Sequence, residues 1–135
     1  MTKFNQIAGD HVFTIPVAGQ STAGTPDEFV GFRAPYPLKI TRVEWVPAAG
    51  VTANGTNYFT LTLRNRGSDG TGTDLPATRS YAATNSTAIT PEDMTLGAAA
   101  LLLVDEDDLL TVEKLVTASG LAMPDGAVII HATAR

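Results

Sequence analysis

Apolar and polar residues alternate along several short stretches of the chain, and the clearest alternation lies in Tyr58–Asn65. Phe59, Leu61 and Leu63 fall on one side of this stretch, while threonine, tyrosine and arginine side chains fall on the other. A period of two is the pattern of a β-strand that buries one face. The stretch therefore predicts a strand with its apolar face in the core.

Six further stretches predict strands from alternation or from the turn residues that bound them. They are His11–Val17, Glu28–Pro35, Leu38–Val46, Leu75–Thr84, Leu109–Thr117 and Ala127–Arg135. Pro16 cannot donate a ladder hydrogen bond, so the first strand should lie at a sheet edge. In Leu109–Thr117 the alternation has one exception, Lys114. Leu96–Val104 is rich in alanine, which favours a helix, but its short length after Gly97 favours an eighth strand.

Two of these strands carry signs of a β-bulge. Gly31 lies inside the second strand, where a glycine indicates a bulge or a close approach of another backbone. In the third strand the apolar residues are even-numbered before Thr41 and odd-numbered after Arg42. Because a slip of one residue moves side chains to the other face of a sheet, the phase change predicts a bulge near Thr41–Arg42.

The segments between the strands are turns rather than long helices. Asn54-Gly55 is a tight-turn signal, so we expect a hairpin over Leu38–Asn65. Thr90–Asp93 combines Pro and acidic residues and predicts one helical turn. Since helical crossovers are missing, the sheets should be antiparallel.

The predicted fold is therefore all-β: an antiparallel β-sandwich of seven or eight short strands, jelly-roll-like or Ig-like, with a small β-barrel as the alternative. We expect residues 11–135 to form a single domain and residues 1–10 to be an N-terminal arm.

Composition narrows the classes of function. The 135 residues include no Cys, which excludes disulfides, thiolate metal sites and a Cys nucleophile. The start of the chain has no apolar core of a secretory signal, and no apolar run is long enough to span a membrane. The net charge is −5, with six Lys or Arg and four Asp or Glu in residues 1–67 but three and ten in residues 68–135. An acidic chain without a basic cluster is a poor candidate for nucleic acid or anionic membrane.

The loop Gly67–Asp74, with the sequence GSDGTGTD, invites two ligand hypotheses. It lacks the spacing and the Lys-Ser/Thr ending of a phosphate-binding P-loop. It offers Asp69 and Asp74 for calcium, but not the alternating ligands and final Glu of an EF-hand. A glycine-rich turn is the simpler interpretation, and its small residues also let another backbone approach closely. We therefore predict partner contacts at Gly67, Asp69, Gly70 and Gly72.

No catalytic residue, cofactor or metal site is indicated. Asp105–Asp108 places four carboxylates together, but neighbouring strand residues point to opposite faces, so a solvated turn is the simpler interpretation. His11 and His131 show no metal-ligand spacing, and no nucleophile motif accompanies them. Trp45 is expected in the core or at an oligomer interface. The protein is therefore not expected to be an enzyme.

Three segments resemble a family of small virion proteins of tailed bacteriophages, the capsid decoration or cement proteins. They are Ile40–Thr73 (ITRVEWVPAAGVTANGTNYFTLTLRNRGSDGTGT), Met94–Lys114 (MTLGAAALLLVDEDDLLTVEK) and Gly120–Thr133 (GLAMPDGAVIIHAT). The similarity covers about two-thirds of the chain and is most specific in the glycine-rich loop. Asp107-Asp108 replaces the family's usual Gly-Asp turn.

This resemblance implies a structural role on the outside of a phage capsid, bound to the lattice of the major capsid protein after assembly in the bacterial cytoplasm. It also implies self-association, with a trimer favoured. We then expect the arm to contact the capsid or a neighbouring subunit, and its candidate contact residues are Lys3, Phe4, Asn5, Gln6 and Ile7.

Two other functions stay open at this point. A carbohydrate- or receptor-binding domain of a phage head or tail would need exposed aromatic side chains, such as Tyr36, Tyr58 and Tyr81, on one face. A hydrolase on a jelly-roll scaffold would need His11 and His131, or carboxylates, to converge in a cleft.

Overall fold

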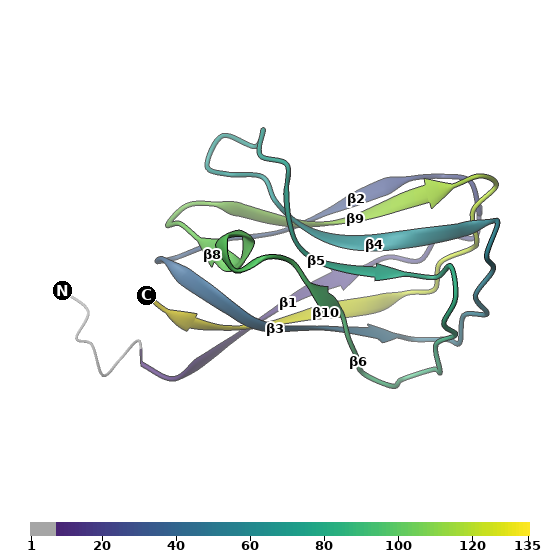
Figure 1. The fold of residues 1–135 in the computed structure, drawn as a ribbon, viewed down its shortest axis with the longest axis horizontal. Coiled ribbons are helices and arrows are strands. Elements are labelled where there is room, and N and C mark those ends of the chain that lie inside the picture. The colour runs from purple at the N-terminus through teal and green to yellow at the C-terminus, as the bar shows by residue number, and fades with distance from the viewer. Residues whose placement is uncertain (1–7) are drawn as a thin grey trace.

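Two antiparallel sheets make up the protein, and Figure 1 shows them one above the other. The structure is a computed structural model that describes residues 8–135. One sheet has the strand order β1-β10-β3-β6, with β8 also paired to β3, and the other has the order β2-β9-β4-β5-β7. The strands are β1 (Asp10–Val17), β2 (Asp27–Arg33), β3 (Leu38–Pro47), β4 (Tyr58–Asn65), β5 (Asp74–Ser80), β6 (Glu92–Asp93), β7 (Thr95–Leu96), β8 (Leu103–Val104), β9 (Leu109–Thr117) and β10 (Gly126–Ala134). The predicted β-sandwich is confirmed.

The strand order is that of a jelly roll rather than an Ig-like sandwich. Consecutive strands lie in different sheets at every step along the chain except from β4 to β5, which are neighbours in one sheet. The orders β1-β10-β3-β6 and β2-β9-β4-β5 are the two four-stranded sheets of that fold. The short strands β7 and β8 and a 3₁₀ turn, η1 (Ala99–Leu102), occupy the connection from β6 to β9.

The core lies between the sheets and is filled by the alternating residues of the inner strands. Phe59, Leu61 and Leu63 of β4 are fully buried, as the alternation predicts. Lys114 of β9, which interrupts the apolar alternation of its strand, is also fully buried and is a charged residue type within the core. The largest other buried side chains are Trp45, Tyr81, Ile15, Leu38, Ile40, Leu110 and Ile130.

Both predicted bulges are present. The register of β2 against β9 shifts between Val30 and Phe32, which leaves Gly31 as the extra residue. In the pairing of β3 with β10, Arg42 lies opposite His131 and Ile40 lies opposite Ala132, which leaves Thr41 as the extra residue. The Thr41 hydroxyl donates to the His131 carbonyl at 3.2 Å. β1 lies at the edge of its sheet, as Pro16 predicts.

The predicted Leu38–Asn65 hairpin is wrong, because β3 and β4 belong to different sheets. A two-residue hairpin turn at Asn54-Gly55 would need positive φ at both residues, and neither residue has it. The Asn54 side chain instead accepts hydrogen bonds from the N–H groups of Thr56 and Asn57, at 2.9 and 2.8 Å. This local turn carries the chain across the sandwich.

Two other local predictions also fail. Thr90–Asp93 does not form a helical turn, because Glu92 and Asp93 pair with Trp45 and Glu44 as the short edge strand β6. The expected strand over Leu96–Val104 is broken into β7, η1 and β8. The break comes after Gly97, whose N–H still donates to the Pro76 carbonyl of β5 at 2.8 Å. The chain then turns through η1, where the Leu101 N–H donates to the Ala98 carbonyl at 2.9 Å. No helix within residues 8–135 is long and apolar enough to span a bilayer.

Replacing Gly31 by Ala should destabilise the sandwich. A Cβ at Gly31 would lie 2.4 Å from Ile15 Cδ1 and 2.6 Å from the Leu110 carbonyl oxygen. Overpacking of this kind costs about 1–3 kcal/mol, measurable as the free energy of unfolding in urea. Gly24→Ala is the matched control, because its Cβ would meet nothing closer than 3.6 Å. Equal stability of Gly31→Ala and the wild type would contradict the close approach.

Candidate functional site

The glycine-rich loop Gly67–Asp74 projects from one end of the sandwich, where it connects β4 to β5 (Figure 1). Its base is fastened to β9 because the Arg66 N–H donates to the Leu109 carbonyl at 2.8 Å and the Leu109 N–H donates to Gly67 at 3.0 Å. Arg33 reaches across from the end of β2 and donates to the Ser68 carbonyl at 3.2 Å. The loop is therefore an exposed projection with a fixed base.

The four predicted contact residues of this loop have different roles. Gly67 and Gly70 adopt positive φ, 68° and 84°, which explains why glycine occupies them. The Asp69 carboxylate accepts hydrogen bonds from the Thr71 N–H and hydroxyl at 3.1 and 2.8 Å, and these hold the pKa of Asp69 below its usual value. Gly72 makes a close approach, but to the loop's own base: its N–H donates to the Arg66 carbonyl at 2.7 Å. The loop is therefore held in shape by hydrogen bonds among its own residues and with Arg66 at its base.

A second turn, Asp105–Asp108, lies at the same end of the sandwich. Asp108 turns inward, where its carboxylate accepts hydrogen bonds from the Asp105 N–H and from the Asn65 side chain, both at 2.9 Å. Arg33 also donates to the Asp107 carbonyl at 2.9 Å, so one guanidinium links this turn to the glycine-rich loop. The predicted turn is confirmed, and its carboxylates do not converge. Within residues 8–135, no group of three or more His, Asp or Glu is placed to hold a metal ion.

The start of the described chain reaches this end as well. Asp10, the last residue of the predicted arm, pairs with Thr133 as the first residue of β1. The Arg135 side chain pairs with Asp105, and its N–H donates to the Pro37 carbonyl at 3.1 Å. The other predicted contacts, Lys3, Phe4, Asn5, Gln6 and Ile7, lie outside the described residues. The loop end of the sandwich is our name for the loop Gly67–Asp74, the turn Asp105–Asp108, the start of β1 and Arg135.

The two histidines do not form one site. His11 faces Ala132 across the β1–β10 ladder and packs edge-to-face on Tyr36, with ring centroids 5.2 Å apart. His131 lies one position away in the same ladder, so its side chain points to the other face of the sheet. There its Nε2 lies 2.7 Å from Glu44.

The tyrosines do not gather into a binding platform. Tyr81 is fully buried, and Tyr36 and Tyr58 are half-buried against the core. Tyr36 lies in the β2–β3 connection at the loop end, whereas Tyr58 begins β4 at the other end. The aromatic cluster that a carbohydrate-binding face would need is therefore not formed by these three residues.

A row of ion pairs covers the outer face of β2, β9 and β4, and the alternation of the strands does not predict it. Arg66 pairs with Glu28 and lies 3.5 Å from Glu113, which in turn lies 2.9 Å from Arg64. The Arg66 hydrogen bond lowers the pKa of Glu28 to about 2, while burial raises the pKa of Glu113. Glu28 and Glu113 stand directly opposite each other on β2 and β9. Arg66 lies close to both carboxylates, and Arg64 pairs with Glu113 alone. These ion pairs link β2, β9 and β4 and stabilise the sheet.

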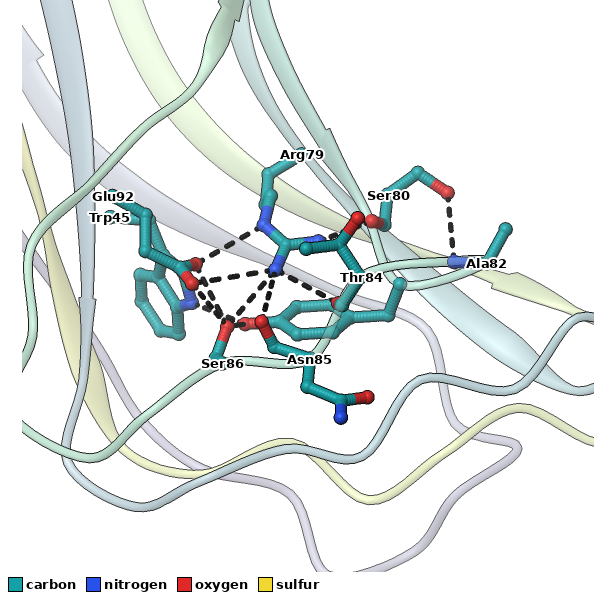
Figure 2. A network of polar contacts seen from close by, with 9 residues as sticks. Trp45, Arg79, Ser80, Ala82, Thr84, Asn85, Ser86 and Glu92 are labelled. Atoms are coloured by element: carbon teal, nitrogen blue, oxygen red, sulfur yellow. Dashed lines mark hydrogen bonds and ion pairs between the residues drawn. The ribbon is translucent and has the colours of Figure 1, made fainter.

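A buried chain of hydrogen bonds joins the two sheets, as Figure 2 shows. Trp45 Nε1 of β3 donates to the Tyr81 hydroxyl at 2.8 Å, and that hydroxyl lies 2.6 Å from Ser86 Oγ. Ser86 donates to the Glu92 carboxylate of β6 at 2.8 Å. Arg79 of β5 donates to the same carboxylate at 3.1 Å and lies over the Tyr81 ring, 4.1 Å from its centroid. We call this set the Trp45–Glu92 relay.

The relay was invisible in the sequence because its members are spread over 48 positions without a motif. The Arg79 guanidinium also donates to the Thr84 carbonyl at 3.0 Å, which ties the connection between β5 and β6 to β5. Ser86 contacts the Tyr81 hydroxyl and donates to the Glu92 carboxylate, so its hydroxyl links Tyr81 to β6.

Comparison with known proteins adds only distant likenesses in fold. No protein-family model and no curated protein sequence matches this chain. The chain is similar to a structure of infectious bursal disease virus, strain Gx, with 17% identity, a TM-score of 0.44 and 92% of this chain covered. It is more distantly similar to a CocE/NonD family hydrolase of Staphylococcus aureus, with 12% identity, a TM-score of 0.32 and 93% covered.

This chain spans 32% of the viral chain and 25% of the hydrolase chain. Neither likeness is close enough to bear on what this protein does.

Removing the Tyr81 hydroxyl should destabilise the protein. Tyr81→Phe leaves the buried Trp45 N–H without its partner and removes one of the contacts of Ser86, which costs about 1–3 kcal/mol in the free energy of unfolding measured in urea. Tyr58→Phe is the matched control, because Tyr58 is half-buried and lies outside the relay. The control should change stability by less than about 0.5 kcal/mol. A loss no larger for Tyr81→Phe than for Tyr58→Phe would show that the relay does not hold the sheets.

Glu28 should make stability depend on pH in the acid range. Its pKa is about 2 in the folded protein against an ordinary 4.5, so its stabilisation is complete above about pH 4.5 and is lost as the pH falls toward 2. Glu28→Gln should therefore cost about 1–2 kcal/mol near neutral pH, and the difference from the wild type should shrink below about pH 4.5.

Urea unfolding over this pH range measures that difference. Glu106→Gln, in the exposed turn of the loop end, is the control and should follow the wild type at every pH. A Glu28→Gln deficit that stayed constant down to acid pH would mean that the carboxylate charge is not what stabilises the fold.

Proposed function

We propose that this protein is a structural virion protein that decorates and stabilises the outside of a tailed-phage capsid by binding the lattice of the major capsid protein. The observation that carries the proposal is where the three resembling segments fall in the fold. Ile40–Thr73 contains most of β3, all of β4 and the glycine-rich loop, and Gly120–Thr133 contains most of β10. Met94–Lys114 leads into β9. The resemblance thus covers inner strands of both sheets and one exposed loop.

The fold suits this role. Jelly rolls serve in viral capsid domains, although they also serve in lectins and cupins, so the fold alone leaves the function open. A Cys-free sandwich held by core packing and by internal ion pairs needs no oxidising compartment. Such a domain can fold in bacterial cytoplasm and then bind to a shell that is already formed.

The loop end is the surface that we assign to the capsid contact. It gathers the predicted contact loop, an exposed turn and the start of β1. Its exposed side chains include Asp69, Asp74, Asp105, Glu106 and Asp107. A partner surface that carries Lys and Arg would complement them.

Self-association would strengthen the binding. A trimer placed over neighbouring capsid subunits would engage several of them at once, and each further contact would form at a high effective concentration. Preferential binding to the assembled lattice would then stabilise the shell by mass action. The alternative of a carbohydrate- or receptor-binding domain gains no support from the placement of the tyrosines.

Capsid binding can be tested by adding purified protein to heads of the encoding phage that lack it. Occupancy is then measured by quantitative mass spectrometry of sedimented heads. Thr73→Arg, exposed on the loop, should weaken binding about tenfold or more, the effect of losing about 1.4 kcal/mol of contact energy. Thr52→Arg, the same change on an exposed residue of the opposite end, should bind like the wild type.

Deletion of residues 1–9 belongs to the same experiment and should also lower occupancy. Failure of the wild-type protein to bind heads would overturn the proposed function. Binding that neither the loop variant nor the deletion alters would leave the function standing and show that another surface makes the contact.

A further inference from the structure

Lys114 is a buried primary amine in the core of the sandwich. Its side chain points inward from β9 with the apolar residues Leu110 and Val112, and it is fully buried. Its Nζ lies 5.6 Å from the centroid of the Phe59 ring. A Leu or Met at this position would fill the space without burying a charge, so the amine calls for an explanation.

Burial of Nζ disfavours its charged form and lowers the pKa of Lys114, while the nearby Asp27 carboxylate acts in the opposite direction. Nζ donates to the Ala23 carbonyl at 3.3 Å, the Gln20 side-chain oxygen at 3.4 Å and the Thr22 carbonyl at 3.5 Å. These three distances exceed the usual length of an N–H···O hydrogen bond. An amine that has lost its proton is a nucleophile.

The amide of Gln20 is held against this amine. The Gln20 backbone forms two hydrogen bonds with Met123, at 2.7 and 2.9 Å, which fix the residue at the start of the β1–β2 connection. Its side-chain Nε2 donates to the Asp27 carboxylate at 2.7 Å, so the side-chain oxygen faces Lys114. Asp27 itself stands directly opposite Lys114 in the β2–β9 ladder. Amine, carboxamide and carboxylate are therefore neighbours in one fixed arrangement.

We propose that Lys114 and Gln20 form an intramolecular isopeptide bond, with Asp27 as the group that transfers the proton. The inference is independent of the proposed function. The neutral Nζ attacks the side-chain carbonyl carbon of Gln20, and a new C–N bond forms. The bond from that carbon to Nε2 then breaks. Asp27 accepts the proton that Nζ loses and delivers it to the departing Nε2, so that one ammonia leaves and no oxidant or reductant is needed.

Ammonia would leave toward solvent, because Gln20 Nε2 donates to the carboxylate of Asp27, which is an exposed residue at the edge of the sheet. The bond would join residues 94 positions apart and tie the β1–β2 connection to β9. In a chain without Cys, such a crosslink would restrict the unfolded state as a disulfide does.

The intact mass of the purified, folded full-length protein under denaturing conditions tests the proposal. The expected result is a mass one ammonia below that of the sequence, together with a branched proteolytic peptide that joins Gln20 to Lys114. Lys114→Met and Gln20→Asn should both show the full sequence mass, since one lacks the amine and the other is too short to reach it. Circular dichroism confirms that each variant is folded.

Asp27→Asn separates the role of the carboxylate from the proximity of the other two groups. It should fold and lose ammonia much more slowly than the wild type, and an unchanged rate would overturn the role of Asp27. A folded wild-type protein that keeps the full sequence mass after prolonged incubation would overturn the isopeptide bond itself.

Discussion

The Trp45–Glu92 relay fixes how the two sheets of this jelly roll meet. The chain leaves β5 in one sheet and must enter β6 in the other, and the relay lies along this crossing. Trp45 anchors it in β3, Arg79 anchors it in β5, and Glu92 closes it in β6. Because buried polar groups are costly unless every one is paired, the relay permits one arrangement of the crossing and penalises others.

The alternation of apolar and polar residues predicted most of the longer strands of the fold. The Tyr58–Asn65 stretch predicted β4 because its two faces differ so clearly, and a phase change or an inserted glycine was enough to locate both bulges. Pairing was harder, since a strand pattern does not say which strand lies beside it. Asn54-Gly55 suggested a hairpin, yet the Asn54 side chain bonds to its own turn and β3 and β4 separate into different sheets.

The candidate site was predictable only in part. Glycines and polar residues marked Gly67–Asp74 as an exposed loop, and the positive φ of Gly67 and Gly70 explains that composition. The sequence did not reveal that Arg33 joins this loop to the Asp105–Asp108 turn, because those contacts span dozens of residues. Nor did it reveal why Lys114 interrupts an apolar pattern, since Gln20 and Asp27 meet it only in the folded chain.

The proposed function places this sandwich on the outside of a phage head, with its loop end toward the shell. A cryo-EM reconstruction of the encoding phage's heads would test this placement. We expect a protrusion on the outer surface into which the jelly roll fits, with Gly67–Asp74 and the start of β1 facing the capsid lattice. Heads that contain this protein yet show no such protrusion, or heads from which the protein is absent, would contradict it.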